Sequence, residues 1–452
     1  MKKIFTLLLL SYAFVMHSQD YTTGNLIVSY NINTDASGAY RDLSLQEYTT
    51  GTTGTPNSAK AVGAAISTGR MVDDRKVAYE GQINASEMGN YIVLTGRSTT
   101  DGTPANTARQ SPLSLVRVSK SKTIEYSDFL ATDAAFKGGS GRSVASVNGT
   151  SFFVATATSS ADAGIRLATF GSTSNSSYFA EGARSVGVYN DEVVAAGGND
   201  PSTYISGVAS TPGTVPTSPA TAFTGPAEPN NYSGLVLFDV DGTEAGNDLM
   251  YVSQRFTGIH KYYKNEGVWT YVNTTNTGDD HIGGYSGFQA MTGRIENGKP
   301  VLYVIKMDNA ANIKTTLYQV IDNTPRTGDW DAGGAANPTY TVLATSNVAT
   351  NQTFRGVAFA PSSTTLSTSD FSKGSRELDW EMYPNPTKGE VYITSKKLLE
   401  FEVFNQLGQK VYDFKMNSNN SRTINLDHLN KGVYFLQGTF ENFKTTKRLV
   451  IN

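Results

Sequence analysis

Short apolar runs separated by polar turns recur along residues 21–361 of the chain. Each run is followed by a polar turn and a second strand-like segment, and no convincing amphipathic helix lies between them. The seven apolar cores are Leu26–Val28, Tyr91–Leu94, Phe152–Val154, Val193–Ala195, Leu249–Val252, Val301–Ile305 and Val357–Phe359. They lie roughly 40 to 65 residues apart, a spacing typical of repeated sheet units with variable loops. The pattern predicts an all-β region built from one recurring motif.

A closed ring of β-sheet blades accounts for this repeat. About 350 residues at ~50 per blade give seven blades, with six as the alternative. Because an open strand edge invites aggregation, we expect the N-terminal strand, Asn25–Tyr30, to pair with the last one, Phe354–Pro361. Two units share a start, Arg142-Ser143-Val144-Ala145 and Arg184-Ser185-Val186-Gly187. The sequence therefore predicts a β-propeller over residues 19–361.

The chain changes character after residue 361. Residues 362–375 are rich in Ser and Thr, which predicts a flexible linker. Residues 376–452 then carry short alternating strands at hairpin spacing, which predicts a small Ig-like β-sandwich. Residues 21–370 hold 23 Lys+Arg and 30 Asp+Glu, a net of −7, whereas residues 371–452 hold 12 and 9, a net of +3. The net charge of −3 for the whole chain hides this difference.

The C-terminal segment carries a set of motifs in a fixed order. They are Tyr383-Pro384-Asn385-Pro386 followed by Gly389, Asn405 and Gly408 within Phe404–Val411, Lys431-Gly432 within Leu426–Leu436, and Lys447 in the last strand. They resemble the type A C-terminal sorting domain of the type IX secretion system of Bacteroidetes-type bacteria, with an ordinary Ig-like stalk as the alternative. The resemblance covers residues 376–452. It implies recognition by the outer-membrane translocon, shuttle and sorting protease, followed by release or attachment to the cell surface.

The N-terminus fits the same export route. Lys2 and Lys3 precede an apolar run, Ile4–Met16, which is shorter than the ~20 residues of a membrane span. We therefore expect residues 1–18 to be a secretory signal peptide, an uncleaved anchor being the alternative. No later stretch reaches 18 apolar residues, so no transmembrane span is expected in the mature protein. The expected localisation is the cell surface or the medium, through inner-membrane secretion and type IX export.

The ring region also resembles a family. The opening segment Gly24-Asn25-Leu26-Ile27-Val28 and the closing segment Phe354–Pro361 are similar to those of a group of secreted bacterial proteins with predicted β-propellers. The resemblance covers most of residues 24–361 and supports the fold and the export. It implies no biochemical activity.

Composition removes several classes of function. The chain has no Cys, which excludes zinc fingers, iron–sulfur sites, thiol enzymes and disulfide scaffolds. Its 37 Lys and Arg do not exceed its 40 Asp and Glu, so nucleic acid is not expected as a partner. Serine-hydrolase elbows, His-Glu-x-x-His motifs and phosphate loops are missing from the sequence. We therefore assign no catalytic residue.

One acidic turn is a candidate metal site. Asp239, Asp241 and Thr243 lie around Gly242, and Asp248 follows. Closely spaced oxygen ligands at a Gly turn suit Ca²⁺, although the EF-hand pattern is not met. An acidic β-turn between two strands is the alternative. Ca²⁺ is the one cofactor that the sequence suggests.

A second set of candidates concerns ligand binding. Trp269 and Tyr285 belong to a group of aromatic residues that can form a platform for sugar rings, with packing between blades as the alternative. His281 follows Asp279-Asp280, a combination that can bind a metal or move a proton, with a solvated loop tip as the alternative. His260, in an alternating strand, is expected to be structural.

Three functional hypotheses follow from these observations. In the first, the propeller binds a glycan, extracellular matrix or a surface protein through one face of the ring. In the second, it is a secreted hydrolase of polysaccharide or phosphoester, calcium-assisted in one version, by analogy of fold alone. In the third, it is a structural part of the surface or gliding apparatus. Carboxylates or His converging in the central channel would favour the hydrolase.

Overall fold

The computed structural model divides the chain into two compact units, Met1–Leu366 and Ser367–Asn452. It describes residues 19–33, 38–73, 80–130, 133, 136, 141–156, 164–179, 183–190, 192–196, 202–208, 221–224, 232–240, 244, 246–254, 258–275, 287–309, 314–330, 338–362, 380–395, 399–406, 409–416, 421–440 and 443–452. The predicted signal peptide, 1–18, and all of the predicted linker except Ser362 lie outside these residues.

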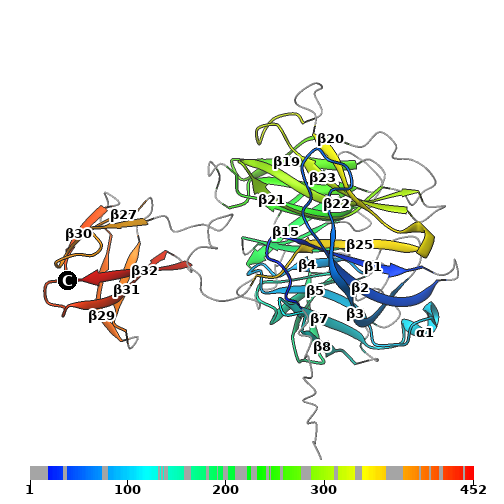
Figure 1. Cartoon of the computed structure of the whole chain (residues 1–452), viewed down its shortest axis with the longest axis horizontal. Helices are drawn as coiled ribbons and strands as arrows, with labels where there is room; N and C mark the ends of the chain where they lie inside the picture. The colour runs from blue at the N-terminus through cyan, green and yellow to red at the C-terminus, as the bar shows by residue number, and fades with distance from the viewer. Residues whose placement is uncertain are drawn as a thin grey trace, which may run out of the picture. The chain divides into compact units, whose positions relative to one another are not determined.

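The first unit is a β-propeller of four-stranded antiparallel blades (Figure 1). From the inner to the outer strand, the blades are: blade 1, β25 (Gln352–Phe359), β1 (Leu26–Ile32), β2 (Ala39–Tyr48) and β3 (Ala61–Asp73); blade 2, β4 (Ile83–Ala85), β5 (Tyr91–Arg97), β7 (Leu113–Ser119) and β8 (Ile124–Asp128); blade 3, β9 (Gly141–Ser146), β10 (Ser151–Thr156), β11 (Ile165–Thr169) and β12 (Asn175–Phe179); blade 4, β13 (Ser185–Tyr189), β14 (Glu192–Ala196), β15 (Ser202–Val208) and β16 (Thr221–Thr224); blade 5, β17 (Tyr232–Phe238), β18 (Leu249–Gln254), β19 (Gly258–Asn265) and β20 (Val268–Thr275); and blade 6, β21 (Gly287–Glu296), β22 (Lys299–Asn309), β23 (Lys314–Ile321) and β24 (Thr339–Thr345).

Short elements complete the first unit. The two-residue strand β6 (Thr103–Pro104) pairs with β2, and the single-turn helix α1 (Ala105–Ala108) follows it. A 3₁₀ turn, η2 (Val348–Thr350), precedes β25. Blades 1 and 2 are joined into one sheet by a single residue pair, Met71 with Arg97.

The inner strands close into a ring. Each contacts the next in the order β4, β9, β13, β17, β21 and β25, and β25 contacts β4 again. Over the described residues this gives six blades, which corrects the count of seven to its alternative. The seventh apolar core, Val357–Phe359, lies in β25, which pairs with β1 and so belongs to the blade that Leu26–Val28 had already counted. Figure 1 shows the yellow β25 beside the blue β1.

The expected closure of the ring is confirmed. β25 and β1 pair antiparallel from Leu26 opposite Phe359 to Ile32 opposite Gln352. The N–H of Ala360 donates to the carbonyl oxygen of Asn25 at 2.9 Å, which extends the pairing by one residue. Because the two strands come from opposite ends of the propeller sequence, this pairing leaves neither of them as an open edge.

The core of the propeller lies between neighbouring blades. Buried apolar side chains of blade 6, including Val301 and Tyr303, pack with Leu26, Val28 and Phe354 of blade 1. Such β-branched and aromatic residues suit a pleated surface that is covered on both faces. In a chain without cysteine, this packing supplies stability that small secreted domains take from disulfides.

The second unit is the expected antiparallel sandwich. One sheet consists of β26 (Trp380–Tyr383), β27 (Glu390–Ser395) and β30 (Ser421–Asn425). The other consists of β29 (Lys410–Lys415), β28 (Glu400–Phe404), β31 (Gly432–Phe440) and β32 (Phe443–Ile451). Trp380, Phe401 and Leu436 are part of the apolar core between the sheets. Within the described parts of both units, no helix is long and apolar enough to cross a membrane.

Candidate functional site

Four of the six inner strands share a backbone irregularity. In β9, β17, β21 and β25, one extra residue interrupts the pairing with the second strand of the blade; these residues are Arg142, Ser233, Gln289 and Arg355. In β4 and β13 the equivalent residues, Gln82 and Arg184, directly precede the first paired residue. A β-bulge turns a side chain away from the normal alternation and is frequent near functional sites.

These six equivalent residues form what we call the axial ring. In blade order they are Arg355, Gln82, Arg142, Arg184, Ser233 and Gln289. Five of them are at most 9% exposed, and Arg184 is partly buried. All six are polar. The second residue after each of them is buried and apolar, except for Asn84 in β4; these residues are Val357, Val144, Val186, Leu235 and Met291. The repeat therefore places polar side chains at one level around the axis of the propeller.

Hydrogen bonds show that this level is narrow. Nε2 of Gln82, in blade 2, donates to the carbonyl oxygen of Ser233 in blade 5 at 2.8 Å and approaches that of Gln289 in blade 6 at 3.4 Å. Nδ2 of Asn84 donates to the carbonyl oxygen of Val144 at 2.7 Å and to that of Val186 at 3.1 Å. The Gln82 amide thus joins blade 2 to blades 5 and 6 across the axis. The Asn84 amide joins blade 2 to blades 3 and 4.

Gln289 differs from its neighbours in the axial ring. Its side chain is 1% exposed, and neither Nε2 nor Oε1 has a hydrogen-bond partner in the part of the chain that the structure describes. Nδ2 of Asn31 and Oγ1 of Thr353, which lie opposite each other in β1 and β25, are also without partners there. A buried polar group without a partner costs about 1–3 kcal/mol, so each of these groups needs an explanation.

Two buried carboxylates, those of Glu80 and Asp73, are held by contacts within the first unit. Oε1 of Glu80 accepts a hydrogen bond from the Tyr40 hydroxyl at 3.0 Å, and Oε2 accepts one from the N–H of Asp73 at 3.0 Å. Burial raises the pKa of Glu80, and the carboxylate of Asp73 raises it further. Asp73 in turn pairs with Arg109 at 3.0 Å. These contacts fix the segment that leads into β4.

The acidic turn predicted as a calcium site joins β17 to β18. Asp248 is fully buried; its Oδ1 accepts a hydrogen bond from the N–H of Val240 at 2.9 Å, and its Oδ2 lies 3.7 Å from Nε of Arg326. Asp241 and Thr243 lie outside the described residues, whereas Asp239 lies within them. Over the described residues, no three His, Asp or Glu side chains are grouped as metal ligands would be. The geometry of Asp248 favours the structural turn, and calcium stays a prediction.

For Trp269, the structure favours packing between blades, the alternative to the aromatic platform. Its side chain is only 7% exposed and packs with Val194, Leu237 and Met250 between blades 4 and 5. Packing between blades explains the residue because its strand, β20, turns this face inward. Tyr285 and His281 lie outside the described residues, so their predicted roles stay predictions. His260 is fully buried beside the rings of Tyr262 and Tyr271, as expected for a structural histidine.

A buried ion pair escaped the sequence analysis. Nζ of Lys261 lies 2.7 Å from Oδ2 of Asp322, and both side chains are fully buried. Lys261 also donates to Oγ1 of Thr324 at 2.7 Å and to the carbonyl oxygens of Pro325 and Gly328 at 3.0 Å each. Burial lowers the pKa of Lys261, while Asp322 acts in the opposite direction. The pair connects the loop after β23 to blade 5. It could not be predicted from a local sequence motif.

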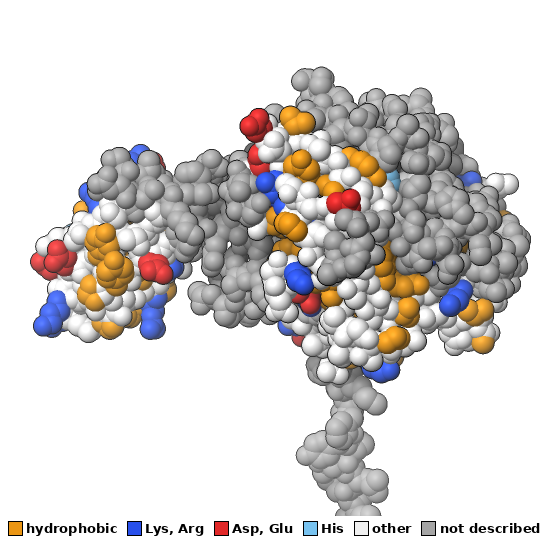
Figure 2. All heavy atoms as spheres, turned by 90° about the horizontal axis from the view of Figure 1, so that it is seen from above, with side chains coloured by type: hydrophobic (Ala, Val, Ile, Leu, Met, Phe, Trp, Pro, Cys, Tyr) orange, Lys and Arg blue, Asp and Glu red, His pale blue; other side chains and the backbone are white. Residues whose placement is uncertain are grey.

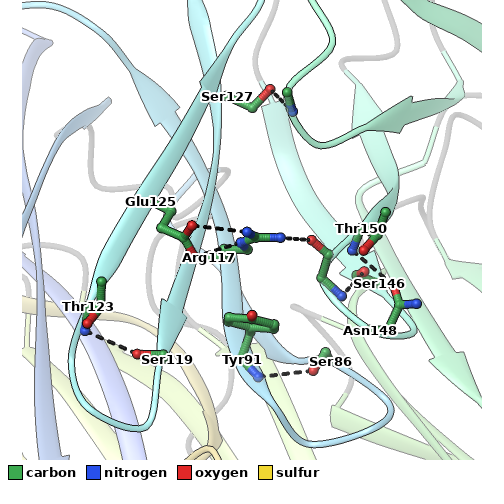
Figure 3. A network of polar contacts seen from close by, with 12 residues as sticks. Ser86, Tyr91, Arg117, Ser119, Thr123, Glu125, Ser127, Ser146, Asn148 and Thr150 are labelled. Atoms are coloured by element: carbon green, nitrogen blue, oxygen red, sulfur yellow. Dashed lines mark hydrogen bonds and ion pairs between the residues drawn. The ribbon is translucent and has the colours of Figure 1, made fainter.

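A second cross-blade contact centres on Arg117 (Figure 3). Its guanidinium donates twice to Glu125, at 2.9 and 3.0 Å, and once to the carbonyl oxygen of Gly149 at 2.8 Å. Figure 3 shows it reaching from β7 toward the turn between β9 and β10, with Tyr91 nearby. A side chain on Gly149 would overlap the Tyr91 ring, so the close approach requires glycine. This network joins blades 2 and 3.

The predicted sorting residues lie at two places in the sandwich. Oδ1 of Asn385 accepts a hydrogen bond from the N–H of Val450 at 2.9 Å, and Nδ2 donates to the carbonyl oxygen of Arg448 at 2.7 Å. Asn385 thereby fastens the Tyr383-Pro384-Asn385-Pro386 turn to β32. Glu381, Met382, Tyr383, Asn385, Lys447 and Arg448 line an open depression of about 440 Å³. Lys447 also packs over the Trp380 ring at 4.9 Å.

The remaining sorting residues shape turns. Gly389 has a φ of +131°, and an added side chain would collide with Asp427, so only glycine fits there. Oδ1 of Asn405 accepts a hydrogen bond from the N–H of Gln409 at 3.0 Å, which closes the turn between β28 and β29. Gly408 lies outside the described residues. Gly432 begins β31 opposite Ile451 of β32, directly after the exposed Lys431.

Residues 381–452 match the family described as secretion system C-terminal sorting domain. The chain therefore carries a type IX sorting domain and is a cargo of that export system, which delivers proteins to the cell surface or medium. The match covers the sandwich and leaves the activity of the propeller open. A comparison with curated proteins finds no match.

Solved structures that resemble the chain are propellers or related folds of low identity. The β-propeller domain of Cps50 (Swd1) from Myceliophteria thermophila is 9% identical, covers 82% of this chain and 96% of its own, and has a TM-score of 0.32. A quinonprotein alcohol dehydrogenase-like protein from Bacteroides thetaiotaomicron is 12% identical, with coverages of 78% and 98% and a TM-score of 0.35. The C-terminal WD40 domain of Sif2 is 11% identical, with coverages of 76% and 89% and a TM-score of 0.29.

Proposed function

We propose that this type IX cargo presents its propeller outside the cell as a binding module for a glycan, matrix component or surface protein. The observation that carries the proposal is the axial ring. Six equivalent strand positions hold guanidinium, amide and hydroxyl groups, which are the groups that proteins use to hold polar ligands. One of them, the Gln289 amide, is buried and without a partner among the described residues.

Export is proposed to proceed in two steps. Residues 1–18 direct the chain across the inner membrane and are removed. The sorting domain is then recognised by the outer-membrane translocon and its shuttle, and the sorting protease releases it from the propeller. The surface around Asn385 and Lys447, which joins the first and last strands of the sandwich, is the proposed recognition surface.

The hydrolase is the alternative function, and two of the described buried carboxylates do not support it. Catalytic carboxylates must reach a substrate, whereas Glu80 and Asp73 are engaged with Tyr40 and Arg109. A calcium-assisted version would use Asp239 and Asp241, and the experiment below includes calcium for that reason. A structural role in the surface or gliding apparatus would need no ligand at the axis.

The test is a screen of the purified mature protein against soluble polysaccharides and extracted surface glycans, with and without Ca²⁺. Binding and product formation are measured in the same samples. We expect saturable binding without turnover. Turnover would favour the hydrolase, and the absence of any saturable binding would contradict the glycan-binding form of the proposed function.

A further inference from the structure

We propose that the free edge of β32 takes up an extended acidic segment of the export machinery as an additional strand. The inference rests on the proposed function, because it assigns a binding mode to the recognition surface around Asn385 and Lys447. β32 is the last strand of its sheet, with β31 as its neighbour on one side. An edge strand presents backbone groups with which a strand of another chain can pair.

Hydrogen bonds show which backbone groups of β32 point away from its sheet. Asn385 accepts from the N–H of Val450 at 2.9 Å and donates to the carbonyl oxygen of Arg448 at 2.7 Å. The N–H of Thr387 donates to the carbonyl oxygen of Val450 at 2.8 Å. β32 pairs with β31 over its whole length without a register shift. Because outward groups recur at every second residue of an antiparallel strand, the N–H and carbonyl of Thr446 face the same side, where no described residue pairs with them.

A depression beside this edge can receive side chains of the added strand. Its volume is about 440 Å³, and its lining comes from β26, from the turn at Asn385 and from β32. β26 is also the edge strand of its own sheet, so the depression lies where two strand edges meet. Tyr383, in the lining, is 50% exposed, and its ring lies 5.1 Å from that of Tyr392. An exposed ring held by a second ring offers apolar contact area to a side chain of the partner.

The charge of β32 favours an acidic partner. Its sequence, Phe443–Ile451, holds three cationic residues and no acidic one. Arg448 is exposed and makes no ion pair with a described residue, whereas Lys447 packs over the Trp380 ring. Glu381, on β26, is the one acidic residue among those that line the depression. On the face of the second unit shown in Figure 2, basic and acidic side chains both lie around the hydrophobic ones, so that face shows no comparable excess of one sign.

A second copy of the chain would fit this edge poorly. Pairing two β32 strands would bring their cationic residues together, and like charges across a strand pair are destabilising. Lys and Arg on an edge strand oppose self-association in this way. An acidic strand would instead place a carboxylate near the Arg448 guanidinium, which can hold it by two parallel hydrogen bonds. The composition of β32 therefore favours a different, acidic chain.

Peptide probes test the binding mode on the purified mature protein. Fluorescence anisotropy compares a peptide of alternating Val and Glu, the same peptide N-methylated on two adjacent central residues, and a peptide of alternating Val and Lys. We expect the first to bind about 10-fold more tightly than either of the others, because N-methylation blocks both edges of the peptide and Lys reverses its charge. Equal binding of the N-methylated peptide would overturn strand addition. Equal binding of the basic peptide would overturn the acidic partner.

Variants locate the site. Arg448→Glu should lower the affinity for the acidic peptide about 10-fold, because it replaces attraction by repulsion. Thr446→Pro removes an outward N–H, a change that an edge strand tolerates, and should have an effect of similar size. Lys388→Glu, an exposed charge reversal outside the depression, is the matched control and should leave the affinity unchanged. If both β32 variants keep the unfolding temperature of the parent and bind like the control, the inference is wrong. Should Thr446→Pro fail to fold, Arg448→Glu decides the question alone.

Surface delivery in cells separates this inference from the export assignment. Both β32 variants should accumulate in the periplasm relative to the parent and to Lys388→Glu, as measured by cell fractionation. Normal delivery of the β32 variants, with periplasmic retention of a chain that lacks residues 376–452, would overturn the docking edge and leave the export assignment standing. Normal delivery of the truncated chain would remove both. A dimer of the mature protein that Thr446→Pro dissociates would overturn the acidic partner in favour of self-pairing.

Discussion

The guanidinium carbon of Arg117, in blade 2, lies 4.0 Å from the centre of the Phe170 ring in blade 3. The same group lies 5.0 Å from the Tyr91 ring and is bonded to Glu125 and to the backbone of Gly149. One side chain therefore links aromatic and polar groups of two blades. Such contacts between blades resist the opening of the ring.

Arg117→Ala should lower the free energy of unfolding by about 1–2 kcal/mol, because it removes the cation–π contact and a bidentate ion pair. Urea unfolding of the mature protein measures the change. Lys120→Ala, in the turn after β7, is the control and should have little effect. Arg117→Lys keeps the charge but loses the paired donors, so it should fall between the two. Equal stability of Arg117→Ala and the parent would show that the contact contributes nothing.

Lys261→Met should cost about 3–5 kcal/mol of stability, because it leaves the fully buried Asp322 without its cation. Tyr251, whose hydroxyl donates to Oδ2 of Asp322 at 2.5 Å, does not replace the lost charge. The double variant Lys261→Met with Asp322→Asn should cost less than the sum of the single variants, since no unpaired charge remains. Thermal unfolding checks both, with Lys299→Met as the exposed control. Additive losses would count against a coupled pair.

Acid should destabilise the propeller through His260. Burial lowers the pKa of His260 from 6.5 to about 4. As the pH falls below 6.5, the unfolded chain binds a proton at this position and the folded chain does not, so stability is lost down to about pH 4. The full loss is on the order of 3 kcal/mol at 1.36 kcal/mol per pKa unit. His260→Phe should flatten the pH dependence of the urea midpoint between these limits, and an unchanged slope would exclude the histidine as its source.

The sorting domain yields a prediction about delivery. Deletion of residues 376–452 should leave the protein in the periplasm. Asn385→Ala should reduce surface delivery partially, because the turn loses its two bonds to β32. Cell fractionation with immunoblotting measures both, and Lys388→Ala, at an exposed neighbouring position, is the control. Unchanged delivery of the deletion variant would refute the export assignment.

A structural feature could be predicted from the sequence most readily where neighbouring residues determine it. Alternation of apolar residues and the Pro at 361 are local signals, so the strands were predictable. The pairing of β1 with β25 is not local, and it was predicted from the need to close the ring. The number of blades was not, because an apolar core does not reveal whether its strand opens a blade or completes one that began at Leu26.

The candidate site was harder to predict for the same reason. The shared start at Arg142 and Arg184 was visible, and Arg355-Gly356-Val357 repeats it. Their equivalence with Gln82, Ser233 and Gln289 rests on a backbone bulge, which side-chain patterns do not encode. For Trp269 the sequence left both a platform and packing between blades open, because an alternating strand shows which residues share a face, but not whether that face meets solvent or another blade.

The strand that closes the ring is the last propeller strand to be synthesised, and the sorting domain is made after it. A chain that ends before Gln352 lacks both the closing strand and the sorting domain. Incomplete rings have unpaired strand edges and would be prone to aggregate. Such chains also lack the sorting domain and would not be exported to the cell surface. The order of the two modules along the chain therefore makes export depend on synthesis of the complete ring.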